Sequence, residues 1–176
     1  MNQSNLLHAF LVQLRCIGIK WALPFCWFLG LLLGTTYGYR ADHSYILLLR
    51  YAALNRVSFV GLIAALYVPL LLSTLAVYLN HPQWLLPICF IKAFLFTSCG
   101  SALLIAYHSA GWLVRLLLQF SDFCTMPFLY WFCMRNIVER KSNLASDFLV
   151  CCTGGSIIGI FDFFVISPYL VKLIHI

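Results

Sequence analysis

The sequence has few charged residues. Only 9% of its 176 residues are Asp, Glu, Lys or Arg, whereas 63% are hydrophobic. An average soluble domain carries roughly 25% charged residues, so a chain with this composition cannot cover the surface of a water-soluble globule of its length. The shortage of charge therefore excludes a soluble domain as the main part of the protein.

Polar stretches are short, and the apolar residues between them form long blocks. A helix needs about 20 apolar residues to cross the hydrocarbon core of a bilayer. The blocks predict an all-α fold, a polytopic transmembrane helical bundle with short amphipathic helices at the interface. Residues 1–16 are predicted to form an interfacial lead-in, and residues 17–176 a single transmembrane domain. Its five predicted spans cover about residues 17–39, 57–79, 84–107, 112–134 and 148–173.

Motifs for catalysis are absent from the sequence. It has no metalloprotease, serine-hydrolase or nucleotide-binding motif, and its five histidines fall in the predicted lead-in, connections or terminus. Ser156 follows Gly155 in the fifth predicted span, but no histidine lies at a matching depth to activate it. The eight cysteines have no C-x-x-C spacing and are interpreted as small packing residues. We expect no enzymatic activity, no cofactor and no metal site.

The basic residues outnumber the acidic ones, 11 to 5, yet they form no stripe. This scatter excludes a nucleic-acid-binding surface, and basic residues in connections are expected to set orientation and to contact lipid headgroups. An N-terminus in the cytoplasm places five basic residues inside and four outside, a nearly even count; the basic lead-in and the Arg140–Lys141 pair favour this orientation. The five are Arg15, Lys20, Arg135, Arg140 and Lys141.

Three charged residues lie deep inside predicted spans. Lys92, Asp122 and Asp162 would each cost a few kcal/mol at the bilayer centre, while Arg115, near the start of its span, can extend to the interface. Lys92 and Asp122 differ by only about 6 Å in predicted depth on antiparallel neighbours. We predict an ion pair between them, with Asp162 as a second possible partner. The pair either locks the helical hairpin or forms part of an ion path, a solute path or a docking site.

Glycines mark two candidate packing faces. Gly30 and Gly34 form a G-x-x-x-G pair in the first predicted span, and Gly154, Gly155 and Gly159 lie in the fifth. Small residues at this spacing let helix backbones approach closely inside a membrane.

Lys92–Phe96 opens a predicted helix, Gly111 ends a short turn, and a Leu-rich helix follows to Pro127. Leu29–Gly34 and a longer connection come before this hairpin. The arrangement resembles the stage II sporulation protein M family of bacterial membrane proteins, in which a Lys-Gly-Phe motif precedes a helical hairpin that ends near a proline. The likeness, taken loosely, covers most of the chain.

The sequence departs from the family pattern at several positions. Ala93 replaces the glycine of the motif, and Phe120 and Thr125 occupy positions where the family often has a proline and an acidic residue, with Asp122 nearby. The resemblance implies a bacterial cytoplasmic-membrane protein without an enzymatic centre. Its members are associated with membrane complexes, including a peptidoglycan-remodelling assembly, and some are encoded beside transporter genes.

Two functions remain open from the sequence. The first is a non-catalytic scaffold or assembly subunit of a larger membrane complex, which the small-residue clusters favour. The second is the membrane component of a small-solute transporter, either a permease or a substrate-binding subunit, because buried charges and proline-interrupted helices mark solute paths. The expected partners are the lipid bilayer and other membrane proteins, for example an ABC-type transporter or a cell-wall remodelling complex.

Overall fold

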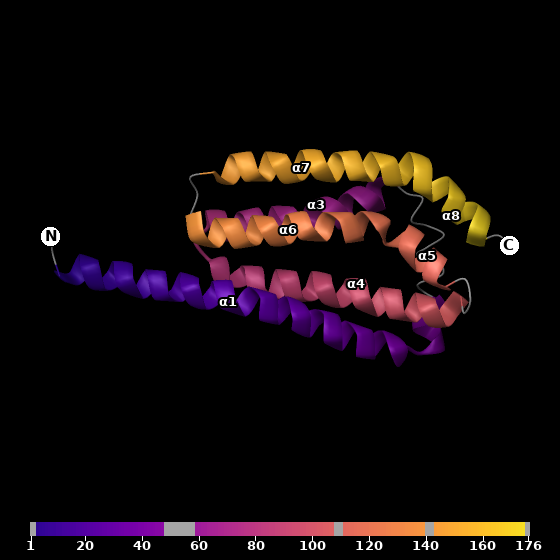
Figure 1. Ribbon diagram of the computed structural model, residues 1–176, viewed down its shortest axis with the longest axis horizontal. Coiled ribbons are helices and arrows are strands. Elements are labelled where there is room, and N and C mark those ends of the chain that lie inside the picture. The colour runs from indigo at the N-terminus through magenta and orange to yellow at the C-terminus, as the bar shows by residue number, and fades with distance from the viewer. Residues whose placement is uncertain (1–2, 48–58, 108–110, 140–142, 175–176) are drawn as a thin grey trace.

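A computed structural model of the protein describes residues 3–47, 59–107, 111–139 and 143–174 (Figure 1). Throughout these residues the regular structure is helical, so the fold is all-α. The helices are α1 (Gln3–Tyr39), α3 (Phe59–Tyr78), α4 (Leu85–Tyr107, after the short 3₁₀ turn Pro82–Trp84), α5 (Gly111–Leu118), α6 (Phe120–Glu139), α7 (Leu144–Phe161) and α8 (Ser167–Ile174), and a π-helical turn, Asp162–Ile166, joins the last two.

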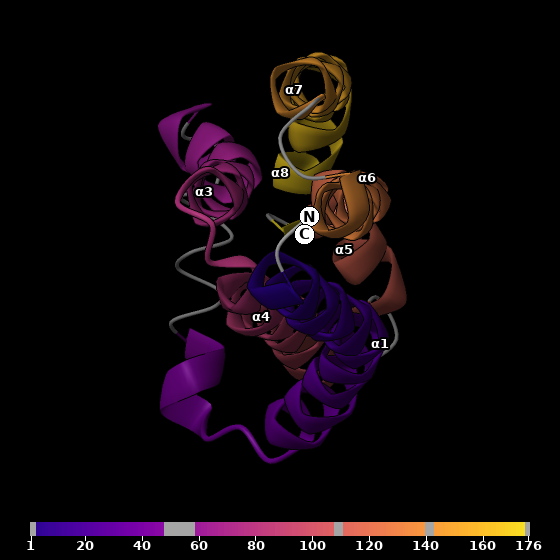
Figure 2. The same ribbon diagram turned by 90° about the vertical axis from the view of Figure 1, so that its left-hand side faces the viewer.

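The long helices lie side by side in one bundle. Figures 1 and 2 show α1 against α4, and α6 between α4 and α7. The most extensive packing is between α1 and α4, and α3 contacts α4, α6 and α7. Helices α1 and α4 run in the same direction, as the matched contacts described below require, and α6 runs against both α4 and α7.

Within the residues that the structure describes, three helices are long and apolar enough to cross a membrane: Gly18–Tyr39, Pro82–Tyr107 and Leu144–Tyr169. They correspond to the first, third and fifth predicted spans. The apolar part of α3 whose side chains are described, Ile63–Tyr78, is shorter than these three helices.

Two predicted boundaries differ from the observed helices. α1 begins at Gln3, so the predicted lead-in is continuous with the first span as one helix, because no helix-breaking residue separates them. The fourth predicted span is divided at Gln119 into α5 and α6, and Figure 1 shows α5 turned away from the axis of α6. The Gln119 amide donates to the Phe96 carbonyl on α4 at 2.6 Å, which ties the junction to the neighbouring helix.

One of the short amphipathic interfacial helices that the sequence predicts, at Tyr45–Leu54, is described only in part. Residues 43–47 are helical, and the remainder lies outside the described residues. The Tyr45 hydroxyl is 3.3 Å from the Ser98 hydroxyl on α4, and burial raises the pKa of Tyr45 above its usual value. This contact holds the segment after α1 against α4.

The fifth predicted span is also irregular near its end. The Ser167 N–H donates to the Asp162 carbonyl, five residues back, instead of four. A proline in a regular helix clashes with the carbonyl four residues earlier, and Pro168 follows this turn directly. The wider π turn accommodates Pro168 without ending the helix.

Small residues form the interface between α1 and α4. A Cβ atom added to Gly30 would come within 2.6 Å of the Phe90 carbonyl and 3.0 Å of Ala93, and one added to Gly38 within 2.7 Å of Ser101. Gly34 faces Thr97 and Phe94 in the same way. The pairs Gly30–Ala93, Gly34–Thr97 and Gly38–Ser101 each differ by 63 in residue number, so the two helices are parallel and in register. The prediction named Gly30 and Gly34 but missed Gly38.

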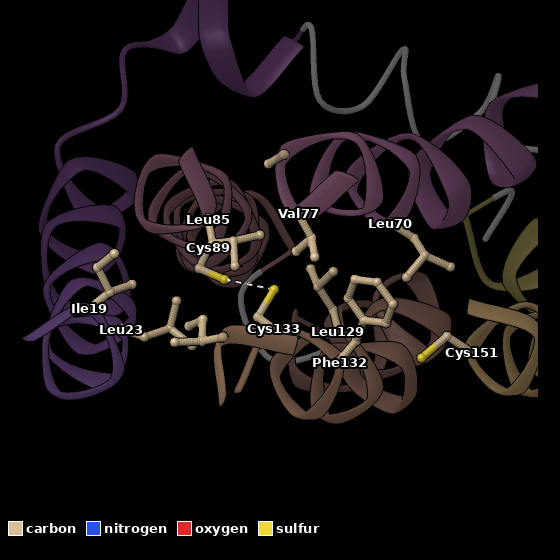
Figure 3. Packing of buried hydrophobic residues seen from close by; sticks show 12 residues of the cluster. Ile19, Leu23, Leu70, Val77, Leu85, Cys89, Leu129, Phe132, Cys133 and Cys151 are labelled. Atoms are coloured by element: carbon tan, nitrogen blue, oxygen red, sulfur yellow. Dashed lines mark hydrogen bonds between the residues drawn. The ribbon is translucent and has the colours of Figure 1, made fainter. Parts of the chain in front are cut away.

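A hydrophobic cluster joins the other ends of these helices to α3 and α6 (Figure 3). Ile19 and Leu23 of α1, Leu85 of α4 and Phe132 of α6 belong to it. Cysteines belong to the same cluster: the Sγ atoms of Cys89 and Cys133 are 3.7 Å apart, and the cysteines whose side chains are described are free thiols. Several of them therefore occupy packing positions in the core, as interpreted from the sequence.

The α1–α4 interface generates the first prediction. Gly34→Ala should lower the free energy of unfolding by about 1–3 kcal/mol, because the added Cβ overpacks the contact with Thr97. Gly18→Ala is the matched control, since a Cβ there meets no atom within 4 Å and alanine is the better helix former. Thermal unfolding of both variants in one detergent measures the difference; equal midpoints would contradict the close approach.

Candidate functional site

Lys92 and Asp122 form an ion pair between α4 and α6. The Lys92 Nζ lies 2.5 Å from Asp122 Oδ1, and the two side chains are 14% and 22% exposed. The pair expected from helix depth is thus present. Lys92 follows Trp84 by eight residues, a rise of about 12 Å along the helix axis. It is the eighth of the 23 residues of α4.

Lys92 also contacts a backbone carbonyl of α3. This carbonyl lacks the usual hydrogen bond within its own helix, because the residue that would donate to it is a proline. Pro69 has no N–H, so the Ala65 carbonyl four residues earlier in α3 cannot form its usual helical hydrogen bond. Lys92 Nζ donates to that carbonyl at 3.2 Å. A neighbouring side chain thereby satisfies the backbone group that Pro69 frees, which is how prolines are accommodated in apolar surroundings.

Asp162 is held by α6. Its carboxylate accepts a hydrogen bond from the Ser121 hydroxyl, and Asp162 is 4% exposed. Ser121 and Asp122 are adjacent in the chain, so one turn of α6 contacts Asp162 on one side and Lys92 on the other. Ser121 is a contact that the sequence analysis missed, because a serine inside an apolar helix gives no signal of its partner.

These four residues, Lys92, Asp122, Ser121 and Asp162, are called the polar centre below. They come from α4, α6 and the π turn, and through Ala65 they also reach α3. The polar centre thus connects four of the long helical segments. Its groups are an ammonium, two carboxyls and a hydroxyl, which can bind a cation or relay a proton but include no activated nucleophile.

A small cavity borders the polar centre. Its volume is about 30 Å³, and Lys92, Thr125, Pro69 and Gly155 are among the residues that line it. This volume has room for about two water molecules. It is small beside the roughly 300–1,000 Å³ of a typical ligand pocket.

The predicted glycine face on α7 packs less closely than that on α1. Atoms of the Phe128 ring lie 3.4–3.8 Å from the position of a Cβ at Gly154, an ordinary contact, whereas a Cβ at Gly155 would meet no atom within 4 Å. Gly155 borders the small cavity, and Gly159 is buried. Of Gly154 and Gly155, Gly154 is the one that contacts α6.

Arg115 lies over a glycine of α4. A Cβ at Gly100 would approach the Arg115 Nε to 2.5 Å and the Gln119 Oε1 to 2.8 Å, so Gly100 leaves the space that both side chains use. The Arg115 guanidinium is also 5.7 Å from the centre of the Trp112 ring. The Gln119 Oε1 is buried and has no hydrogen-bond partner among the described residues. Gly100 and Gln119 were not identified from the sequence.

A second polar contact joins α6 to α7 near the chain's second long connection. The Asp147 carboxylate, 3% exposed, lies 3.4 Å from the Arg135 Nε and accepts from the Asn136 amide at 3.1 Å. Asp147 directly precedes the fifth predicted span, which begins at residue 148. In α7 it shares a helix face with the apolar Leu144 and Cys151, three and four residues away, and this spacing was the available signal for a buried position.

Ser156, the serine considered for catalysis in the fifth predicted span, forms a hydrogen bond with a residue of α3. It shares a hydrogen bond with the Tyr67 hydroxyl, which also donates to the Cys152 carbonyl at 3.2 Å. This arrangement links α3 to α7. In the part of the chain that the structure describes, no group of three His, Cys, Asp or Glu side chains is placed to hold a metal ion.

Comparison with known proteins gives no relative for this chain. No protein-family model matches it, and neither a curated protein nor a solved structure is significantly similar to it. The resemblance to the stage II sporulation protein M family stays a prediction from the sequence.

The polar centre generates a prediction about folding. Lys92→Met should destabilise the bundle by roughly 3 kcal/mol, because it leaves the Asp122 carboxylate buried without its cation. Lys92→Met combined with Asp122→Leu should recover most of that loss, since an apolar pair of similar size replaces the ion pair. Thermal unfolding in detergent measures both, with Lys172→Met, at an exposed lysine, as the control. A stable single variant would contradict this reading of the pair.

Proposed function

We propose that this chain is a non-catalytic integral membrane subunit that crosses the bilayer five times and assembles with other membrane proteins. The proposal has three parts: insertion in a membrane, five crossings, and an assembly role in place of transport. Each part is supported by a different feature of the bundle.

The distribution of polarity supports insertion in a membrane. Large apolar side chains cover the outer faces of the helices; Ile157 and Phe164, for example, are 70% and 69% exposed. Polar side chains lie inside, among them Ser73, Asn136 and Asp162. A water-soluble bundle has the opposite arrangement, whereas polar residues of membrane proteins face the bundle interior.

The directions of the helices support five crossings. α1 and α4 are parallel, so a chain that crosses the bilayer through both must return between them, and α3 is the long helix in that interval. Contacts of α6 with α4 and with α7 are antiparallel, so α6 provides the second return. α3 and α6 have 20 residues each, about 30 Å of helix, which matches the hydrocarbon thickness.

The closed ion pair is the observation that carries the assembly role. A transport path needs charged groups that line a wet cavity or broken helices that open around a midplane site. Here Lys92 and Asp122 face each other at 2.5 Å, and the cavity beside them is about 30 Å³. The deep charges therefore act between helices, as expected of residues that fix the arrangement of a bundle.

One feature favours the alternative of a solute-transporter component. The helix ending at Phe161 continues through a π turn whose first residue is the buried Asp162, and π turns in helices are frequent at functional sites. A carboxyl at an irregular turn could bind a cation or proton in another conformation. The pull-down described below separates this alternative from the assembly role.

Reporter fusions test the number of crossings. With five crossings, fusions after Asp42 and after His81 lie on opposite sides of the membrane, because α3 crosses between them. With three crossings, through α1, α4 and α7 alone, the two lie on the same side. Paired alkaline phosphatase and green fluorescent protein fusions at both positions measure the sidedness, and a fusion after Asn143 should match that after His81.

A pull-down in mild detergent tests the assembly role. The tagged chain should co-purify with other membrane proteins in a fixed ratio, which mass spectrometry identifies, and the variant with Lys92→Met and Asp122→Leu should retain the same partners. This is expected because the polar centre lies inside the bundle and does not form its outer surface.

Two outcomes would contradict the proposal. A chain that purifies alone from its native membranes would rule out a stable complex. A double variant that keeps its partners and its thermal stability but abolishes uptake of a solute by the complex would assign the polar centre to a transport path.

A further inference from the structure

An apolar groove opens on the outer surface between α1 and α6. Pro24, Trp27 and Leu31 line it from α1, Phe123 and Tyr130 from α6, and its volume is about 670 Å³. The rings of Trp27 and Tyr130 meet edge to face, with centroids 5.6 Å apart. Phe123 is 69% exposed, so the groove faces the surroundings of the bundle.

The groove lies within one half of the bundle's length. The constant offset of 63 between α1 and α4 places Trp21 level with Trp84, and both indoles are exposed, as is typical of residues at a membrane boundary. From Lys20, beside that boundary, to Leu31 the helix rises about 16 Å. Half of a hydrocarbon core of about 30 Å is nearly the same length, so the groove spans one leaflet.

A cation stands at the boundary end of the groove. Lys20, Pro24, Trp27 and Leu31 are spaced by four, three and four residues, so they share one face of α1. Lys20 is exposed, and its side chain is directed toward the N-terminal end of the helix, away from the apolar part. This arrangement matches a molecule with an apolar tail and an anionic head.

From this arrangement we propose that the groove binds an anionic phospholipid of the leaflet on the N-terminal side, with an acyl chain along α1 and α6 and the phosphate at Lys20. The inference rests on the proposed insertion in a membrane, but it does not depend on the protein partners. Such a lipid would fill the space that α1 and α6 leave between them, and Lys20 would select an anionic headgroup over a zwitterionic one.

Fluorescence quenching by brominated lipids tests this inference on the full chain. Trp27 is kept as the single tryptophan, and Trp21, Trp84, Trp112 and Trp131 are replaced by Phe. The chain is reconstituted in vesicles of phosphatidylcholine with increasing fractions of brominated phosphatidylglycerol or brominated phosphatidylcholine. Quenching of Trp27 should need about fivefold less of the anionic lipid, the ratio that corresponds to about 1 kcal/mol for one basic residue at the membrane surface.

Matched variants identify the cation. Lys20→Gln should abolish the preference for phosphatidylglycerol, and Lys20→Arg should keep it. Arg40→Gln removes one positive charge at the other end of α1, where Arg40 is exposed, and should also keep it. A second measurement uses the chain with all its tryptophans. After washing in detergent, this chain should retain phosphatidylglycerol and its Lys20→Gln variant should not. The retained lipid is measured as lipid phosphorus.

Three results would overturn the inference. Equal quenching by both lipids, unchanged in Lys20→Gln, would mean that the groove holds bulk lipid only. No quenching of Trp27 would mean that lipid does not enter. A partner helix cross-linked to the groove would assign it to protein assembly. Failure of membrane insertion is recognised separately, because the reporter fusions at Asp42, His81 and Asn143 would then all lie on one side.

Discussion

An ammonium group inside a helical bundle has three N–H donors, and in apolar surroundings each needs an acceptor. Lys92 of α4 reaches the Asp122 carboxylate of α6 and the Ala65 carbonyl of α3. That carbonyl lacks its helical donor because of Pro69. A shift of any of these helices by one turn, about 5.4 Å, would leave a charge or a carbonyl unpaired. The positions of α3, α4 and α6 along the bundle axis therefore follow from Lys92.

The position of α1 has a different physical origin. Gly30, Gly34 and Gly38 bring its backbone against α4, and in a membrane such close packing supplies attraction that the hydrophobic effect does not. Dispersion contacts depend steeply on distance, so the three glycines act together: displacement of α1 along α4 would bring a larger residue to each contact. The position of α1 against α4 is thus set by shape complementarity, whereas the positions of α3 and α6 against α4 are set by charge and hydrogen bonds.

The sequence predicted the class of fold and the Lys92–Asp122 contact, because hydropathy and helix rise are properties of one segment at a time. It also identified Gly30 and Gly34 by their spacing. The contact between Lys92 and Ala65 could not be predicted, since it depends on which helix lies beside α4, and sequence order does not give that. The break at Gln119 was missed for a similar reason: an amide donor to Phe96 on α4 matters only once the two helices are adjacent.

The groove on the outer surface follows from these two modes of packing. Near Leu23 and Trp27, α1 touches both α4 and α6. Beyond Trp27 the glycines draw α1 toward α4, while the Lys92–Asp122 pair keeps α6 on the other side of α4, and Figure 1 shows α1 and α6 diverging in that direction. Leu31 and Phe123 then face each other across open space. Closing the groove would require α1 to leave its glycine contacts, so the packing of α1 on α4 keeps open the space that the proposed lipid tail would occupy.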